Sequence, residues 1–576
     1  MNVWQARSFT PERVQAFENL GFSKAFSRLL AVRAINPAEV DSFLHPSLKQ
    51  IKEQPVWPNL QRAAAEIITT IEADETVVIF GDYDCDGVSA TAILYSILKK
   101  IPGARVFPFI PRRKDEGYGI SDAAIARLKA ECPEVALIVT LDNGISAVDH
   151  VDQLRGEGIK VIVTDHHLPG ARVPNCLVVN PKCEEPSSDC YQQFEPLCGA
   201  AIAFFLVQEI VQLAQKKGLL PSHQKFGAEP LILAGLATVT DACPLLGINR
   251  LLVQLSLQNF QKWASMGLKQ LYLDTSSQAK DDLTVVDYGF KLGPNINSVG
   301  RMGDARLAFD LMVETDRERA RELVRQMKIA NAERKTQETK MTQAAQEKIV
   351  PNAPAQVIVL DEGSGGVSGI VASRILSSLK PPCPVCVVID GRGSARAPAG
   401  YHLKEAFDAA SSSLENYGGH ALAGGFTVKE GQIAAFTTQF YAACQAQAKK
   451  LPPQFLLYDS ELELDDLTLD LVDNLKDLSP FGEGNPEPIF LLSHLTLKTY
   501  SHRDGSHPRI QFYLGNEHPI RGLLWHPSET ERKELSQLQG RPCDWLVNLR
   551  RSSYGGEQVE LNILAFRPSE RIASHS

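Results

Sequence analysis

The sequence has no long apolar run. Its longest, residues 200–207, ends at Gln208 and Glu209, far short of the ~20 apolar residues that a membrane-spanning helix needs. Near the amino terminus no basic segment leads into an apolar stretch, so a signal peptide is not indicated. We therefore expect a protein without a membrane partner, located in the cytoplasm.

Cysteine is sparse and a basic excess is missing. The eleven cysteines are scattered, and the one close pair, Cys383 and Cys386, has no second CxxC to complete a zinc site. We expect reduced, mostly buried thiols. With 59 Lys and Arg against 68 Asp and Glu, the formal net charge is −9, which argues against a protein that coats nucleic acid by bulk charge. Any path for nucleic acid has to be local.

What the chain does have is an ordinary globular composition. Its 576 residues are 44% hydrophobic and 22% charged, which excludes wholesale disorder and fibrous repeats. At about 150 residues per domain, the length predicts roughly three to four domains.

The first organised segment alternates short β-branched runs with amphipathic stretches, the pattern of parallel strands and crossover helices. Nearly continuous apolar strands need cover on both faces, so the predicted fold class is α/β with a parallel sheet. The expected strands are 76–84, 104–111, 135–143, 160–167 and 177–180, with helices over 89–100 and 121–131.

The rest of the chain predicts a connecting helix, a second α/β unit and a small β barrel. Residues 315–349 contain no Gly or Pro, and a helix of that length reaches about 50 Å. Strands 356–360 and 385–390, helices 369–379 and 402–410, and a Gly-rich return over 418–426 form the second unit; short alternating strands follow from about residue 455. The expected division is an N-terminal segment 1–60, a catalytic domain 61–312, the helix 313–350, the second α/β domain 351–452 and the barrel 453–570.

Acidic residues follow three of the predicted strands. Asp82, Asp84 and Asp86 come after the first, Asp142 after the third, and Asp165, His166 and His167 after the fourth. Because open parallel sheets bind ligands beyond the carboxyl ends of their strands, these side chains should meet in one crevice. If the chain stays extended from residue 82 to 86, the three aspartates point the same way.

Carboxylates packed this closely repel one another unless cations neutralise them. Carboxylate oxygens with one or two imidazoles suit Mn²⁺ or Mg²⁺. Two such ions can activate a water and stabilise the leaving oxygen at phosphorus, so the pattern favours phosphoester hydrolysis. For Asp86, before Gly87, a helix cap or turn is the alternative, and Cys85 is expected to be a small buried side chain.

The three runs GDYDCDG (81–87), LDNGIS (141–146) and TDHH (164–167) resemble the DHH phosphoesterase superfamily in order and spacing. Further runs resemble one family within it, the RecJ family of bacterial exonucleases that degrade single-stranded DNA 5′ to 3′. These runs are 111–119, 240–241, 293–301, 366–374, 418–420 and 480–488. The resemblance covers roughly residues 60 to 570 and implies a DHH domain, a DHHA1-type second domain and an OB fold for the barrel.

The resemblance also implies roles for individual residues. Two divalent ions, Mn²⁺ or Mg²⁺, would be held with Asp142 as the bridging ligand; the implied ligands are Asp84, Asp86, Asp142, His166 and Asp241. Asp82 and His167 would lie beside them, which completes a catalytic set of seven. The 5′ phosphate would be held by Arg301, Ser394 and Arg396, with Arg113 and His420 along the substrate path. Arg374 is a further candidate DNA contact, although in a predicted helix it could instead pair with a carboxylate.

One departure from the family pattern concerns substrate handling. Gly363 and Ser364 stand where the family usually has a Trp-His pair, so a stacking or hydrogen-bonding contact is in doubt. The metal set is untouched by this change. In the barrel, the aromatic side chains of Tyr500, Phe512, Tyr513, Trp525 and Trp545 could stack bases, but core packing is the expectation for most of them.

The predicted function is a metal-dependent exonuclease that degrades single-stranded DNA 5′ to 3′ into 5′ mononucleotides in repair and recombination. The alternatives are a DHH-family phosphodiesterase of short oligonucleotides and a non-catalytic DNA-binding replication scaffold. The expected partner is single-stranded DNA, with a RecQ-type helicase and a single-strand-binding protein as candidates, and the expected state is a monomer.

Overall fold

The structure is a computed structural model that describes residues 3–117, 119–222, 228–276, 283–451, 455–503, 509–515, 520–553 and 556–569. The chain divides into two compact units. The smaller comprises Met1–Glu53, Pro244–Leu246 and Gln454–Ser576, and the larger comprises Gln54–Cys243 and Gly247–Pro453. The domain limits drawn from the sequence stay predictions. Among the described residues, no helix combines the length and the apolar character needed to cross a bilayer.

The first sheet of the larger unit is parallel, as predicted. Its strand order is β3-β2-β4-β5-β6, and all five residues of β2 are buried, which explains their continuous apolar character. The strands are β2 (Thr76–Phe80), β3 (Arg105–Phe109), β4 (Val135–Leu141), β5 (Lys160–Thr164) and β6 (Leu177–Val179).

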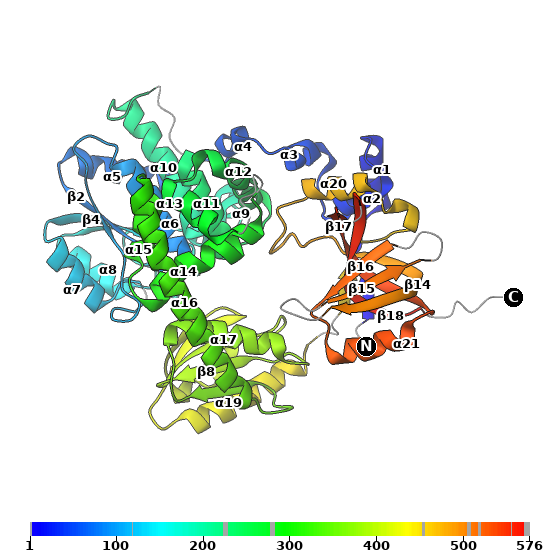
Figure 1. Cartoon of the computed structure of the whole chain (residues 1–576). Helices are drawn as coiled ribbons and strands as arrows, with labels where there is room; N and C mark the ends of the chain where they lie inside the picture. Colours follow the sequence, from blue (N-terminus) through cyan, green and yellow to red (C-terminus); the bar gives the residue numbers. More distant parts are fainter. Residues whose placement is uncertain are drawn as a thin grey trace. The chain divides into compact units, whose positions relative to one another are not determined.

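Helices cover both faces of this sheet (Figure 1). On one face, α7 and α8 pack on Val78, Phe80 and Ile138, and the Ser121 side chain caps α7 by accepting from the Ala124 N–H. On the other, α10 packs against α5 and α6. The helices are α5 (Pro58–Glu72), α6 (Cys85–Leu98), α7 (Asp122–Glu131), α8 (Val148–Gly156), α9 (Asp189–Phe194), α10 (Gly199–Lys216), α11 (Ala228–Thr240), α12 (Gly247–Trp263), α13 (Met266–Thr275), α14 (Gly293–Met302) and α15 (Arg306–Val313), with a π-helical turn at Asp287–Leu292.

The predicted connecting helix is α16 (Arg317–Glu347), which begins where the Asp316 side chain accepts a hydrogen bond from the Arg319 N–H. In Figure 1 it runs from the helices of the first sheet to α17. The second sheet has the order β10-β11-β9-β8-β7, and only β7 and β8 are parallel. Its elements are β7 (Gln356–Leu360), α17 (Gly365–Ser378), β8 (Val385–Ile389), β9 (Arg392–Arg396), α18 (Leu403–Ala409), β10 (Leu414–Gly419), β11 (Ala423–Val428) and α19 (Ile433–Ala448).

Two elements of this second domain were not predicted. Strand β9, with the sequence RGSAR, has no apolar alternation; pairing with β8 on one side and β11 on the other holds it extended. Helix α19 lies beyond the last predicted element, and it buries Phe436, Phe440 and Cys444 against the sheet.

The smaller unit is built on a six-stranded sheet in which β14 pairs with both β15 and β17, so the sheet closes as a barrel. Phe512 and Trp545 are buried in its core together with Phe26 and Leu29 of the N-terminal helices, whereas Tyr513 and Trp525 are exposed. The strands are β1 (Val3–Ala6), β12 (Phe455–Tyr458), β13 (Ser460–Glu461), β14 (Phe490–Arg503), β15 (Arg509–Leu514), β16 (Ile520–Trp525), β17 (Pro542–Ser552) and β18 (Gln558–Pro568). The helices are α1 (Pro11–Asn19), α2 (Lys24–Val32), α3 (Val40–Leu44), α4 (Leu48–Lys52), α20 (Leu469–Asp477) and α21 (Glu529–Leu538).

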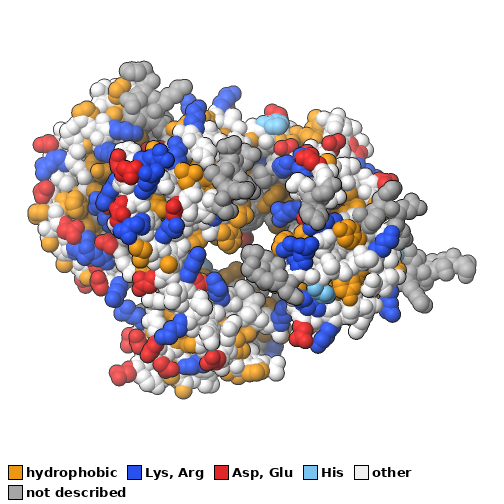
Figure 2. Space-filling view, in the orientation of Figure 1, with side chains coloured by type: hydrophobic (Ala, Val, Ile, Leu, Met, Phe, Trp, Pro, Cys, Tyr) orange, Lys and Arg blue, Asp and Glu red, His pale blue; other side chains and the backbone are white. Residues whose placement is uncertain are grey.

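The surface charge is mixed. On the face that Figure 2 shows, the basic and acidic side chains of the described residues are interspersed rather than gathered into one field. This agrees with the net charge of −9 and directs attention to local clusters of charge.

Candidate active site

The site lies at the carboxyl ends of three neighbouring strands. The sheet register pairs Phe80 of β2 with Thr140 of β4, and Leu141 of β4 with Thr164 of β5. The residues that follow these strands therefore emerge at one edge of the sheet. Asp82, Asp142 and Asp165 are all buried there, as the sequence predicted from the topology of a parallel sheet.

The chain does not stay extended from Asp82 to Asp86, so the condition for three aspartates pointing the same way is not met. Strand β2 ends at Phe80 and α6 begins at Cys85. Asp84 is the N-cap of this helix, with its carboxylate accepting from the N–H groups of Asp86 and Gly87 at 2.9 and 3.1 Å. A Cβ at Gly87 would lie 2.5 Å from the Cβ of Asp82, so glycine is what lets the helix begin this early. Helix capping thus outweighs alternation in this segment.

Asp86 is held by a different helix. Its two carboxylate oxygens accept hydrogen bonds from the N–H groups of Gly199 and Ala200, both 2.7 Å long. These are the first residues of α10, and the amino end of a helix favours a negative charge. Asp86 therefore does not cap its own helix; it is fixed in place by α10.

Asp142 sits in a tight turn directly after β4. Its φ angle is 63°, a left-handed conformation that aspartate tolerates better than most residues. A Cβ on Gly199 would lie only 2.6 Å from the Cβ of Asp142, so the start of α10 needs a glycine to approach this turn. The packing directs the Asp142 carboxylate into the cluster.

The two histidines differ in their surroundings. The His166 Nε2 lies 3.1 Å from Oδ1 of Asp142, 3.7 Å from Oδ2 of Asp86 and 3.9 Å from Oδ2 of Asp241. His167 instead uses Nδ1 to contact Oδ1 of Asp165 at 2.8 Å, and its side chain is more open to solvent. Asp241 follows the last residue of α11 and completes the cluster.

Together these side chains form three overlapping groups. Within each group, the potential ligand atoms lie within 4.8 Å of one another. The groups share Asp142 and His166, so one cluster can serve more than one ion. All seven residues of the predicted catalytic set belong to it. The groups are Asp82, Asp84 and Asp142; Asp86, His166 and Asp241; and Asp142, His166 and His167.

Burial and mutual repulsion raise the free energy of the ionised carboxylates in the cluster when no cation neutralises them. Burial and the charge of Asp84 raise the pKa of Asp82 well above its usual range, and burial and Asp86 do the same to Asp142. The pKa of Asp241 rises to about 8, from burial and then Asp86. Among the residues that the structure describes, none provides a hydrogen-bond partner for the buried Oδ1 atom of Asp82. A divalent ion would relieve each of these penalties, so the donor set fits a hard cation.

The two imidazoles respond oppositely to the same surroundings. Burial lowers the pKa of His166 to about 4, which leaves its ring neutral and able to bind a metal. Burial also opposes the charged form of His167, but the hydrogen bond to Asp165 and the charges of Asp165, Asp241 and Asp86 together outweigh it and raise the pKa of His167. The sequence indicated the pair but not this difference.

A second set of predicted residues forms a cluster of positive charge. Arg301, in the last turn of α14, donates from Nη1 to the Gly366 carbonyl at 2.9 Å. Burial and the neighbouring Arg113 lower the pKa of Arg301 to about 10, and the same two causes lower the pKa of Arg396. Arg113 lies over the Tyr83 ring, 5.0 Å from its centroid. Guanidinium groups brought together against their repulsion suit an anion such as phosphate.

The remaining predicted contacts fall in two places. Ser394, on β9, shares a 2.8 Å hydrogen bond with the Ser368 hydroxyl, and the His420 ring stacks 6.5 Å from that of His167. The contact with His167 places His420 beside the acidic cluster, whereas Ser394 lies against α17. The Arg374 guanidinium pairs with the Glu338 carboxylate, and its role as a DNA contact stays a prediction.

Some residues that shape the site were not singled out from the sequence. Asn297 accepts a hydrogen bond from the Cys85 N–H at 2.7 Å, and Lys182 donates to the His166 carbonyl at 2.6 Å. Asn297 lies in a run that carried the family resemblance, which was a usable signal. Lys182 had no comparable signal, since it is one lysine in a loop. Cys85 is buried, as expected.

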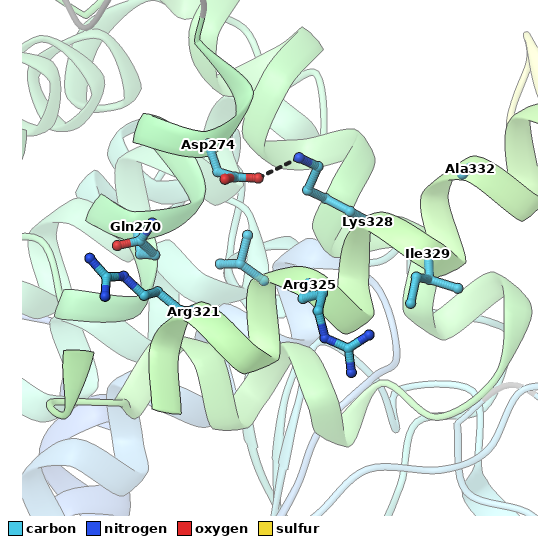
Figure 3. Close-up of a pocket in the computed structure, with 8 residues that line it drawn as sticks. Gln270, Asp274, Arg321, Arg325, Lys328, Ile329 and Ala332 are labelled. Carbon is cyan, nitrogen blue, oxygen red and sulfur yellow. Dashed lines mark ion pairs between the residues drawn. The ribbon is translucent and has the colours of Figure 1, made fainter. Parts of the chain in front are cut away.

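A separate pocket of about 370 Å³ lies between α13 and α16 (Figure 3). Its three cations already have partners: Arg321 pairs with Glu318, Arg325 with Glu322, and Lys328 with Asp274. The pocket therefore offers little uncompensated charge to an anionic ligand, and it contains none of the predicted site residues. The lining residues are Gln270, Asp274, Arg321, Val324, Arg325, Lys328, Ile329 and Ala332.

Comparison with known families agrees with this geometry. The family model "DHH family, N-terminal domain" matches residues 76–234, which hold the first sheet and most of the acidic cluster. The fold and the site thus define a domain of the DHH family. A second model, "RecJ OB domain", matches residues 458–565.

Several RecJ proteins are similar over most of the chain. The single-stranded-DNA-specific exonuclease RecJ of Thermus thermophilus is 34% identical over 440 residues, or 75% of this chain and 61% of that protein. RecJ of Bacillus subtilis is 29% identical over 527 residues, 89% of this chain and 64% of that protein. RecJ of Dickeya dadantii is 29% identical, and 91% of its length is covered. The chain thus spans less than two thirds of the first two relatives.

Solved structures extend the comparison to the fold. RecJ from Thermus thermophilus in complex with Mn²⁺ superposes with a TM-score of 0.82 at 29% identity, over 99% of this chain and 80% of that one. A structure of exonuclease RecJ bound to manganese is 33% identical, with a TM-score of 0.57, over 69% of this chain and 96% of that one. The chain belongs to the RecJ family.

Proposed function

We propose that this protein is a metal-dependent exonuclease that degrades single-stranded DNA from the 5′ end to 5′ mononucleotides. One observation carries the proposal: a buried cluster of Asp and His side chains lies in the same compact unit as three converging arginines. The first suits divalent ions and the second suits a phosphate. The relatives named above as single-stranded-DNA-specific exonucleases support the same substrate.

The cofactors in this proposal are two Mn²⁺ or Mg²⁺ ions. Asp84, Asp86, Asp142, His166 and Asp241 would hold them, and the unpartnered Oδ1 of Asp82 favours a cation nearby. Bound there, the ions would activate a water and stabilise the leaving oxygen. Two related structures, from Thermus thermophilus, were solved in complex with Mn²⁺ and with Mg²⁺.

The protein's own groups would position the strand. Arg301 and Arg396, with the Ser394 hydroxyl, would hold the 5′ phosphate, because guanidinium groups bind phosphate oxygens in a fork. Since Asp165 engages Nδ1 of His167, the Nε2 side of that ring is directed away from Asp165, toward substrate. Its stacking partner His420 would lie along the same path.

The proposal also covers the setting of the reaction. We place the enzyme in the cytoplasm, as a monomer acting in DNA repair and recombination. A RecQ-type helicase would supply single strands, and a single-strand-binding protein would be a further partner. Catalysis would belong to the domains at 61–312 and 351–452, and strand binding outside the site to the barrel at 453–570, through exposed rings such as Trp525.

A cleavage time course tests the proposal. A long single strand labelled at its 5′ or its 3′ end is incubated with Mn²⁺, Mg²⁺ or chelator, beside the same sequence as blunt duplex. We expect immediate release of the 5′ label as mononucleotide, only from the single strand and only with metal. An intact long strand together with rapid hydrolysis of dinucleotides would show an oligonucleotide phosphodiesterase instead, and would make residues 363–364 the first suspect. DNA binding without any cleavage would show a scaffold.

A further inference from the structure

The long helix α16 buries a row of polar side chains. Asn331, Arg334 and Glu338 are only 6%, 8% and 2% exposed. Their spacing of three and four residues places them on one face of the helix. Buried polar and charged groups are unfavourable unless each finds a partner. This face therefore has to be explained by what it contacts.

The row forms one continuous chain of hydrogen bonds and ion pairs across three helices. The side-chain amide of Asn331 donates to the side-chain oxygen of Asn295, on α14, at 2.8 Å. Arg334 donates to the Asn331 side-chain oxygen at 3.0 Å and to Oε2 of Glu338 at 2.6 Å. The other Glu338 oxygen, Oε1, pairs with Arg374 of α17. The Glu338 carboxylate thus joins two guanidinium groups on two helices.

The two outer helices carry the two halves of the proposed site. On α14, Asn297 binds the Cys85 N–H inside the acidic cluster, and Arg301 contacts the Gly366 carbonyl at the start of α17. On α17, Ser368 binds the Ser394 hydroxyl. A Cβ at Gly369 would lie 3.0 Å from the Arg396 guanidinium, so this helix also packs directly on that arginine. The placement of α14 against α17 therefore sets the distance from the metal ligands to Ser394 and Arg396.

We propose that Glu338 is a positioning residue that fixes the spacing between the metal centre and the 5′-phosphate contacts, and so the register at which the strand is cut. The inference rests on the proposed function. Glu338 does not touch the substrate; it acts through Arg334 and Arg374. Two hydrogen-bonded charge pairs are directional, so they favour one position of α17 along α16. Arg374 is, on this reading, a link between helices rather than a DNA contact.

The test measures product length and the split between KM and kcat on a 5′-phosphorylated single strand with Mn²⁺. Glu338→Gln and Arg374→Met each break the link to α17. We expect a KM at least about tenfold higher for both, and dinucleotides among products that are mononucleotides alone for the parent protein. The double variant should be no worse than the worse single one, because both changes break the same chain. Arg374→Lys, which retains the ion pair, should restore mononucleotide products.

Controls separate positioning from folding and from direct binding. Glu322→Gln removes an exposed carboxylate on the same helix, one that pairs with Arg325, and should behave like the parent. Arg374 is 61% exposed in its side chain, so Arg374→Met carries the test if Glu338→Gln does not fold. Folded variants that keep the parent KM and give mononucleotides alone would overturn the inference, as would tighter strand binding by Glu338→Gln. A parent protein that leaves the strand uncut would instead overturn the proposed function.

Discussion

The Nε2 atom of His166 lies 3.1 Å from Oδ1 of Asp142, although the two residues follow different strands, β5 and β4. Both side chains are buried, and both belong to more than one of the ligand groups in the cluster. They are therefore the centre of the site, and the first prediction concerns Asp142.

Asp142→Asn should abolish cleavage while the fold survives. Asparagine has the same size and tolerates the left-handed φ of 63° at this position. Changing a group that supports a metal ligand lowers metal affinity or activity about 10- to 100-fold. We expect the loss of a shared ligand itself to lower activity by more than this. Burial raises the pKa of Asp142, which means that its charge destabilises the metal-free fold. The variant should therefore melt no lower than the parent without metal, and it should lack the rise in melting temperature that we expect Mn²⁺ to cause in the parent. Near-normal turnover would disprove the two-metal assignment.

Arg301→Lys should weaken the binding of a 5′ phosphate. Lysine keeps the charge but not the fork of donors, and a hydrogen bond to a charged group is worth about 1.5 to 3 kcal/mol. We expect KM for a 5′-phosphorylated strand to rise about 10- to 100-fold, with a smaller change for a 5′-hydroxyl strand. Arg325→Lys, at an exposed position of α16, serves as the control. Equal losses on both strands would argue against a phosphate contact.

Gly199→Ala should disturb the cluster through packing alone. The new methyl group would lie 2.6 Å from the Cβ of Asp142, so α10 must shift and weaken its two hydrogen bonds to Asp86. Overpacking of this kind costs about 1 to 3 kcal/mol. Thermal melting with and without Mn²⁺ should show a lower stability and a smaller metal effect. Gly156→Ala, at the end of α8 and in open space, should show neither change.

Asp287→Asn should reduce stability in a pH-dependent way. Burial opposes the charge of Asp287, but Lys291 and the Thr284 N–H and hydroxyl outweigh it and lower its pKa. A carboxyl with a lowered pKa stabilises the fold above its unfolded pKa of about 3.9, and this contribution is lost as the pH falls through the folded value. Melting at pH 7 should show the variant about 1 to 2 kcal/mol less stable, and the gap should close below about pH 4. A difference in stability between parent and variant that stays constant with pH would show that the charge of Asp287 is not its cause.

How much of the site the sequence could predict depends on the range of the forces involved. Asp82, Asp142 and His166 follow buried β-branched strands, and the ends of parallel strands must share one edge, so their convergence was predictable. The conformation between Asp82 and Asp86 was not, because helix capping by Asp84 and close packing at Gly87 compete with alternation. The anchoring of Asp86 by α10 joins residues more than a hundred positions apart, for which local pattern holds no signal.

In the second domain, too, the features that depend on contacts between distant segments were not predictable from the sequence. Its two apolar strands, β7 and β8, were predictable from their composition, but the polar strand β9 was not, since only its two neighbours hold it extended. The pairing of Arg374 was left open between DNA and a carboxylate, and the structure pairs it with Glu338. Two residues 36 positions apart meet there only because α16 and α17 pack together.

The sequence by itself determined which residue types form the site, the order of the α/β units and the edge at which the acidic residues gather. These follow from residue type and short-range periodicity, which act over a few positions. The tertiary structure alone decided which helix holds Asp86, which histidine has the lowered pKa and how α14, α16 and α17 are joined. Those outcomes depend on burial and on hydrogen bonds between distant segments, and burial exists only once the chain has packed.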